Sequence, residues 1–304
     1  MDCKAISKEK SIKNAKSTFI SYTFVLPFFI LFLVFTVLPV AISLVLSLTS
    51  FNILETPVFV GFRNYTRLLF HDRTFLIAIK NTALIAILTG PGGYILCLLF
   101  AWLINELPPK MRAIVTLIFY APSISGNAYL IWGVLFSGDQ YGYINSILLR
   151  LNIISSPIIW LQDTKYMMTI VIIVSLWLSL GTSFLSFIAG FQGIDRSYYE
   201  AAAVDGIRNR WQELWFVTLP LIRPQMMFSA IMSITSAFGV GAVITNLCGN
   251  PSTGYAVHTI VNHLEDYGSV KFEMGYASAI ATILFVVMVV CNLVIKRLIS
   301  KVGE

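Results

Sequence analysis

Charged residues are scarce in this sequence. Its 304 residues include 21 basic and 15 acidic ones, together 12%, whereas about 25% of the residues in an ordinary soluble domain are charged. Hydrophobic residues make up 57% of the chain, so too few polar side chains remain to cover the surface of soluble domains of this length. The composition therefore excludes an ordinary soluble enzyme and indicates a protein that lies in a lipid bilayer.

Cysteine and histidine are also few. The four cysteines are far apart in the chain, so neither a disulfide framework nor a zinc site is indicated. The histidines form no metal-binding or catalytic-triad pattern, and we expect surface or loop positions for His71, His258 and His263. The glycine-rich run 90–93 lacks the Lys-Ser/Thr of a phosphate loop and favours a kink or a tight helix contact. We therefore expect no catalytic residue, metal ion or cofactor in this chain.

Long uncharged stretches are abundant instead. A helix needs about 20 apolar residues to cross the hydrocarbon core of a bilayer. Six uncharged stretches reach that length: 17–54, 81–105, 113–138, 166–194, 224–264 and 274–295. The first is much longer than the apolar core of a cleaved signal peptide, and the others follow it. The sequence therefore predicts an all-α, polytopic membrane helical bundle with six transmembrane helices.

The positions of the basic residues predict the orientation of this bundle. If the N-terminus is inside, the cytoplasmic segments contain the lysines of the N-terminal tail and most of the other basic residues: Lys110, Arg112, Arg196, Arg208, Arg210, Arg223, Lys296, Arg297 and Lys301. The positive-inside rule therefore places both termini in the cytoplasm. We divide the chain into a cytoplasmic tail 1–18, a transmembrane domain 19–297 with a cytoplasmic loop 191–224, and a second cytoplasmic tail 298–304.

The cytoplasmic loop 191–224 contains the most informative pattern. Ser197 is followed three residues later by Glu200, which is a capping-box pattern, so we expect a helix to begin there. Gly206 can adopt the left-handed turn that ends this helix. Apolar residues at helical spacing then share one face of a second short helix, namely Trp211, Leu214 and Trp215. On pattern alone the loop is either a docking surface, whose alanines allow close approach, or a segment that merely lies on the membrane.

The residues of this loop carry a resemblance to a known family. The runs Tyr199-Glu200-Ala201-Ala202, Asp205-Gly206 and Thr218-Leu219-Pro220 resemble the EAA signature of the membrane subunits of binding-protein-dependent ABC importers. The flanks are similar to the carbohydrate branch, the maltose-type and glycerol-phosphate-type permeases, with supporting matches at 61–65, 81–82, 121–122, 142–145 and 275–279. The chain departs from the family at Ile207, where alanine is common, and in the additional Arg208 and Arg210.

The resemblance implies a transport subunit and not an enzyme. Such a permease would import a sugar or oligosaccharide that an extracytoplasmic binding protein delivers to the cytoplasmic membrane of a bacterium or archaeon. A second, non-identical permease subunit would complete the pathway, and two cytoplasmic ATPase subunits would bind ATP and Mg²⁺; no nucleic acid is implied. Carried over residue by residue, coupling to the ATPase falls to Tyr199, Glu200, Ala201, Ala202, Ala203, Asp205 and Gly206.

A sugar pathway through the bilayer also needs polar and aromatic side chains at membrane depth. Uncharged polar residues in membrane spans mark either pathways or helix contacts, and we expect most of them to be helix contacts. The candidates for the pathway are Asn127, Tyr129, Trp177, Thr182, Ser183, Ser233, Thr235 and Ser236. Two alternatives stay open at this point: an ABC importer of another polar solute, and an ATP-independent carrier or channel.

Overall fold

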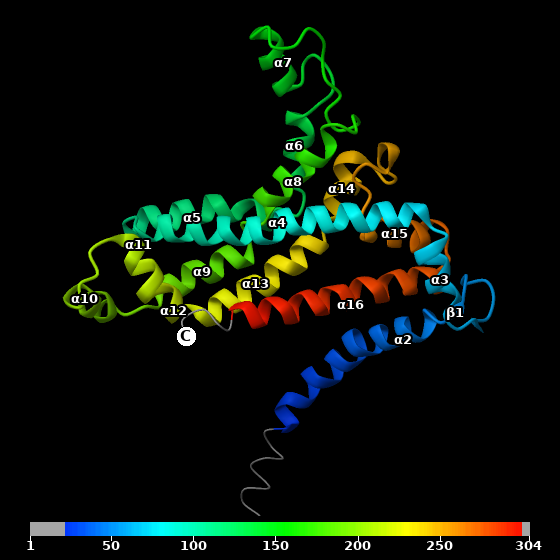
Figure 1. Ribbon diagram of the computed structural model, residues 1–304, viewed down its shortest axis with the longest axis horizontal. Helices are drawn as coiled ribbons and strands as arrows, with labels where there is room; N and C mark the ends of the chain where they lie inside the picture. The colour runs from blue at the N-terminus through cyan, green and yellow to red at the C-terminus, as the bar shows by residue number, and fades with distance from the viewer. Residues whose placement is uncertain (1–21, 300–304) are drawn as a thin grey trace, which may run out of the picture.

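The computed structural model describes residues 22–299, which form an elongated bundle of helices (Figure 1). Its two ends are called here the α10 end and the α3 end, after the short helices that lie there (Figure 1). The described chain is mostly helical, as predicted, and also has one antiparallel strand pair, β1 (Thr49–Ser50) with β2 (Val58–Phe59). The predicted tail 1–18 and residues 300–304 of the second predicted tail lie outside the described residues.

Five helices of the described chain are long and apolar enough to cross a membrane: Tyr22–Leu46, Arg73–Asn105, Met167–Gln192, Arg223–Cys248 and Met274–Ile299. A sixth crossing requires Pro109–Ile124 and Tyr129–Leu135 to count as one span, although the two are bent by 87°. The third predicted span is therefore not one straight helix. The bend lies in a run of small and polar residues, 125–127, in which Gly126 takes a φ of +60°.

These long helices are subdivided. The first contains the π-helical turn η1 (Leu33–Val37) and ends in α2 (Leu38–Leu46), the second is α4 (Arg73–Asn105), and the bent third comprises α5 (Pro109–Ile124) and α6 (Tyr129–Leu135). The fourth comprises α8 (Met167–Leu178) and α9 (Thr182–Gln192), the fifth α13 (Arg223–Phe238) and α14 (Gly241–Cys248), and the sixth is α16 (Met274–Ile299).

Short helices lie in the connecting segments. They are α3 (Arg63–Phe70), α7 (Tyr143–Arg150), α10 (Arg196–Val204), α11 (Arg210–Glu213), η2 (Leu214–Thr218), α12 (Leu219–Leu221), η3 (Thr253–Tyr255), α15 (Ile260–Glu265) and η4 (Asp266–Val270). The segment from α10 to α12 lies at the α10 end, whereas α3 and α15 lie near the α3 end (Figure 1).

The packed centre of the bundle is formed by α4, α9 and α13. Its fully buried side chains include Cys97, Phe184 and Phe187. Small residues allow the close approach, because a Cβ added to Gly93 of α4 would lie 2.7 Å from the hydroxyl oxygen of Ser179. Since α4 continues as a helix through the whole glycine-rich run, that run provides a tight helix contact.

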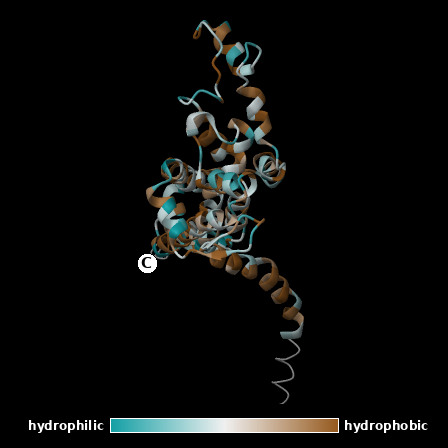
Figure 2. Cartoon of the chain, turned by 90° about the vertical axis from the view of Figure 1, so that its right-hand side faces the viewer, coloured by the Kyte–Doolittle hydropathy of each residue, from teal (hydrophilic) through white to brown (hydrophobic). Residues whose placement is uncertain are grey.

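The first helix stands apart from this centre. Every side chain from 22 to 42 is exposed, and most of the helix projects away from the bundle while its α2 end approaches α16 (Figure 1). In Figure 2 this projecting helix is brown, hence hydrophobic, along most of its length. An apolar helix that is unburied within its own chain must face lipid or another protein chain.

Candidate functional site

Helix α10 begins two residues earlier than the sequence pattern suggested. Asp195 is the N-cap, and its carboxylate accepts a hydrogen bond of 2.9 Å from the backbone N–H of Ser197. The predicted capping box of Ser197 and Glu200 is therefore wrong, because Asp195 already occupies the capping position. The hydrogen bonds from the backbone and hydroxyl of Ser197 hold the pKa of Asp195 below its usual value.

The end of α10 matches the prediction. Gly206 has a φ of +96°, a conformation that favours glycine. The N–H of Ile207 donates to the carbonyl of Ala202 at 3.0 Å, and the N–H of Gly206 donates to that of Ala203 at 3.3 Å. These two bonds form a Schellman motif, so the helix is closed at a defined residue and the chain reverses towards α11.

Only one face of α10 contacts its own chain. Ala202 is 7% exposed, and the half-buried Tyr199 places its hydroxyl 3.4 Å from that of Thr218 in η2. The other predicted coupling residues are exposed: Glu200, Ala201, Ala203, Asp205 and Gly206. The helix thus presents a carboxylate and two small side chains outward, a surface that another protein can approach closely.

The second half of the loop also differs from the prediction. Leu214 is 3% exposed, whereas Trp211 and Trp215 are more than half exposed, so the three do not share one buried face. From Leu214 onward the chain forms the π-helical turn η2, which shifts the spacing of faces after this residue. The ring of Trp211 lies 5.1 Å from that of Trp102 in α4, which attaches the loop to the second span.

Arg210 strengthens this attachment. Its guanidinium lies 3.1 Å from the carboxylate of Glu106, between α4 and α5, and 2.9 Å from that of Glu213 in α11. These pairs are largely exposed, so each contributes little to stability. Their geometry nevertheless connects the loop that carries α10 to the turn between the second and third spans.

A second candidate region lies where three spans are interrupted. The breaks are at 125–128 between α5 and α6, at 179–181 between α8 and α9, and at 239–240 between α13 and α14. The second break touches the last turn of α5, next to the first break, since a Cβ added to Gly181 would lie 3.1 Å from the Cβ of Ser123. Helix α14 in turn contacts α6 and α8. Interrupted helices at membrane depth are tolerated where they are buried in protein or line a water-filled cavity.

The predicted pathway residues fall into two groups around these breaks. Ser183 and Ser233 are buried, their hydroxyls are 3.3 Å apart, and the Ser183 hydroxyl donates to the carbonyl of Ser229 at 3.1 Å. This pair is therefore a contact between α9 and α13. Asn127, Thr182, Thr235 and Ser236 are exposed, while Tyr129 and Trp177 are half-buried.

The exposed group is the better candidate for a pathway. Ser123 and Ser125 also belong to it, since both are exposed beside the first break, and the sequence reasoning missed them. The sequence does contain serine, glycine and asparagine shortly after Pro122. Such residues also occur at ordinary helix contacts, so the sequence alone does not distinguish the two roles. Exposed hydroxyl and amide groups at membrane depth are costly in lipid, so this surface is suited to face a polar pathway or another chain.

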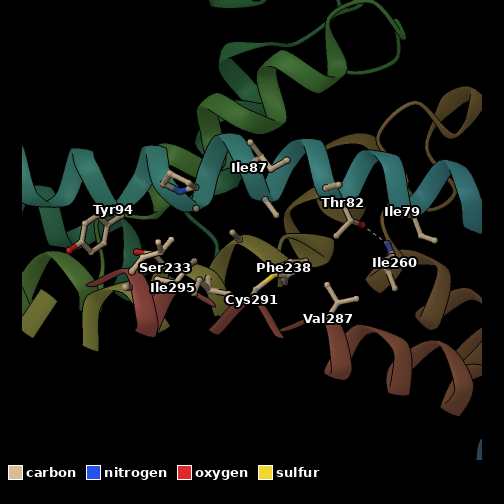
Figure 3. A pocket seen from close by; sticks show the side chains of 18 of the residues that line it. Ile79, Thr82, Ile87, Tyr94, Ser233, Phe238, Ile260, Val287, Cys291 and Ile295 are labelled. Carbon is tan, nitrogen blue, oxygen red and sulfur yellow. Dashed lines mark hydrogen bonds between the residues drawn. The ribbon is translucent and has the colours of Figure 1, made fainter. Parts of the chain in front are cut away.

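A cavity of about 610 Å³ lies elsewhere, between α4, α13 and α16 (Figure 3). Its lining is almost entirely apolar. The hydroxyl of Thr82 accepts a bond from the backbone N–H of Ile260 at 2.9 Å, and Ser233 lies against Ser183. With these hydroxyls engaged, the cavity offers a sugar few hydrogen-bonding groups, and we do not assign the substrate to it.

The α3 end contains a polar cluster that the sequence reasoning missed. His258 and His263 are each 1% exposed, so a surface position is wrong for both. Both do lie in the loop between the fifth and sixth spans, which agrees with the expected loop position. Asp72, just before α4, lies 3.0 Å from Nε2 of His263 and accepts a 2.8 Å hydrogen bond from the hydroxyl of Tyr276. Because these partners are distant in the sequence, no local pattern could reveal the cluster.

The charges of this cluster follow from its hydrogen bonds. Burial acts to raise the pKa of Asp72, but hydrogen bonds from His263, the backbone of Phe75 and Tyr276 hold it well below its usual range. Burial, together with the neighbouring His263, lowers the pKa of His258 to about 4. Asp72 is thus ionised and His258 neutral at pH 7. Among the described residues no group of three or more His, Cys, Asp or Glu is placed to hold a metal ion.

Comparison with known proteins gives consistent results. The family described as "Binding-protein-dependent transport system inner membrane component" matches residues 4–303. The probable ABC transporter permease protein YesP of Bacillus subtilis (strain 168) is 33% identical, over 96% of this chain and 94% of that protein. The arabinooligosaccharides transport system permease protein AraP of the same organism is 31% identical, over 91% and 87%.

A solved structure is similar along the whole chain. It belongs to a bacterial alginate ABC transporter in complex with an alginate pentasaccharide-bound periplasmic protein. The matched chain is 26% identical and superposes with a TM-score of 0.77, covering 96% of this chain and 99% of that one.

Proposed function

Because the chain belongs to the family of binding-protein-dependent transport system inner membrane components, we propose that it is the permease subunit of an ATP-driven importer that couples through α10. The family is one of transport subunits, and the two relatives named above are transport permeases, one of them named for arabinooligosaccharides. The observation that carries the coupling role is the outward face of α10, closed by Gly206 and resembling the EAA signature.

The substrate we propose is a sugar or oligosaccharide delivered by an extracytoplasmic binding protein. Two relatives support this class, since one is named for arabinooligosaccharides and the solved transporter is named for alginate. The exposed polar groups at the three helix breaks support it too, because sugars are held by hydrogen bonds to hydroxyl and amide groups. The pathway would then run past the exposed Asn127, Thr182, Thr235 and Ser236.

The proposed topology has both termini in the cytoplasm. It is supported by the basic residues of the α10 end, where Lys110 and Arg112 lie in the first turn of α5 and Arg196 is the first residue of α10. The α3 end is then extracytoplasmic. In this arrangement the domain 19–297 is the permease domain, and α10 points towards the cytoplasmic partners.

The proposed partners are a second, non-identical permease, two ATPase subunits that bind ATP and Mg²⁺, and the binding protein. A second membrane chain is supported by two surfaces, the exposed first helix and the exposed polar residues at the breaks. No residue that the structure describes covers either of them. Closure of the ATPase pair would displace α10. The contacts of Tyr199 with Thr218 and of Arg210 with Glu106 would pass this movement to the fifth span and to the turn between the second and third.

Reconstitution tests this function directly. The chain is expressed with the permease and ATPase genes next to its own and placed in liposomes with the neighbouring binding protein. We expect sugar uptake that requires ATP, the binding protein and all membrane subunits. Uptake by this chain alone, without ATP, would instead establish a carrier or channel, and uptake of an amino acid or another polar solute in place of sugars would overturn the substrate class.

The pathway can be tested with a pair of matched hydroxyl deletions. Thr182→Val keeps the side-chain shape and removes one exposed hydroxyl. We expect uptake per assembled complex to fall about tenfold, because the loss of one hydrogen bond to the sugar costs about 1.4 kcal/mol. Ser183→Ala removes a buried hydroxyl that only joins α9 to α13, so it should lower thermal stability and leave uptake per complex nearly unchanged. Equal uptake by both variants would show that the hydroxyl of Thr182 does not contact the sugar in the pathway.

A further inference from the structure

The loop 249–273, between the fifth and sixth spans, is joined to the rest of the α3 end by several buried polar contacts. Asn81 of α4 donates through its amide to the carbonyls of Tyr255 and His258, each at 3.0 Å. Asn262 of α15 is fully buried and donates to the carbonyl of Gly241 at 3.1 Å and to the hydroxyl of Thr245 at 2.8 Å. The loop is therefore fixed to both the second and the fifth span.

Asp72 occupies the point where most elements meet. One carboxylate oxygen caps α4 by accepting the N–H of Phe75 at 3.0 Å, and the other accepts from His263 of α15 and Tyr276 of α16. A carboxylate only accepts, so His263 must donate through Nε2, and its Nδ1 then faces Nε2 of His258 at 3.3 Å. One acidic side chain thereby joins the second span, the sixth span and the loop.

The same loop carries exposed apolar side chains in a charged setting. Val270 is 67% exposed and Phe272 is 50% exposed, although Lys271 and Glu273 stand next to them in the chain. Phe272 has a φ of +57°, which is costly for a residue with a side chain and persists only when its surroundings enforce it. Exposed apolar residues flanked by charges face water rather than lipid, and such patches mark protein contacts.

We propose that Asp72 is a positioning residue of the transport cycle, which locks loop 249–273 through His263 and Tyr276 and so presets the surface where the sugar-loaded binding protein docks. The inference rests on the proposed function, because it requires the α3 end to be extracytoplasmic. Docking on a preset loop avoids the entropic cost of ordering it in the complex. Asp72 itself is not expected to touch the binding protein, since its side chain is only 10% exposed.

The test compares Asp72→Asn with the wild type in the complete reconstituted transporter. We expect the concentration of sugar-loaded binding protein that half-saturates ATP hydrolysis to rise about tenfold, because the uncharged amide holds His263 less well and the loop loses its fixed position. The maximal rate should change less than twofold. A purely structural role would lower the yield of complex and its maximal rate without moving the half-saturating concentration.

Two further variants keep the test decisive. Tyr276→Phe retains the ring and removes one hydrogen bond to Asp72, and we expect a two- to threefold increase in the half-saturating concentration even if Asp72→Asn fails to assemble. Glu55→Gln is the matched control, since it removes an exposed carboxylate in the segment between β1 and β2, outside loop 249–273, and should have an effect below twofold.

The outcomes separate the two proposals. If the wild-type complex shows no stimulation by the binding protein, the proposed function fails. If the wild type is stimulated and both Asp72→Asn and Tyr276→Phe half-saturate at the wild-type concentration, only the positioning role of Asp72 is overturned. If Glu55→Gln shifts the half-saturating concentration as much as Asp72→Asn does, any carboxylate at this end has the same effect, and the specific lock is overturned.

Discussion

Glu200→Lys is expected to abolish ATP-driven uptake and binding-protein-stimulated ATP hydrolysis, to below about a tenth of the wild type. Glu200 is exposed in the middle of α10, and its side chain makes no hydrogen bond or ion pair with any residue that the structure describes. Reversing its charge therefore costs the chain itself little. In the proposed complex Glu200 would face a basic site of the ATPase partner, where the change replaces attraction by repulsion and costs several kcal/mol at a close contact.

The control for this prediction is Glu55→Lys, which reverses an equally exposed carboxylate in the segment between β1 and β2. It should leave ATP-driven uptake within about twofold of the wild type. Membrane insertion, measured by blotting of washed membranes, should be normal for both variants, and co-purification of the ATPase should be lost only with Glu200→Lys. Normal uptake by Glu200→Lys would contradict the proposed coupling role of α10.

Gly275→Ala is expected to prevent the chain from reaching its folded state. The N–H of Gly275, in the first turn of α16, donates to the carbonyl of Phe51 at 3.1 Å. A Cβ at this position would collide with the carbonyl oxygen of Thr49 and lie 3.1 Å from the backbone nitrogen of Phe51. Since these are backbone atoms held by β1, they cannot move aside as a flexible side chain would, and we expect a loss of about 3 kcal/mol or more.

A neighbouring glycine supplies the comparison. A Cβ added to Gly268 would meet the Cβ of Ala277 at 3.5 Å, which is ordinary van der Waals contact. Gly268→Ala should therefore melt within a few degrees of the wild type, whereas Gly275→Ala should give little monodisperse protein after detergent extraction. Similar yields and melting temperatures for the two variants would contradict this account of the joint between β1 and α16.

The parts of the fold that were predicted are those that the bilayer or a single residue determines. The uncharged stretches correspond to α4, α8 with α9, and α16, because a charged side chain inside the bilayer is energetically costly. Gly206 was expected to take a left-handed turn because glycine adopts it without strain, and its φ is +96°. In these cases local chemistry is sufficient, and no knowledge of distant contacts is needed.

The parts that were missed depend on contacts between distant residues. The pattern could not choose between Asp195 and Ser197 as the cap of α10, since both are good capping residues and the path of the preceding chain decides. The burial of His263 depends on Asp72, which lies 191 positions earlier. The 87° bend in the third span likewise depends on where α6 meets α14, and the sequence of the span alone gives only the small residues that permit it.

The joint at Gly275 also has a consequence for the order of biosynthesis. The first helix makes its contacts with the other described spans chiefly through α2 and β1, and their partner is α16, which is synthesised after the other described spans. The first helix therefore remains in the membrane with its apolar surface exposed until α16 has been made. During this interval the exposed apolar surface makes the incomplete chain prone to aggregation and degradation.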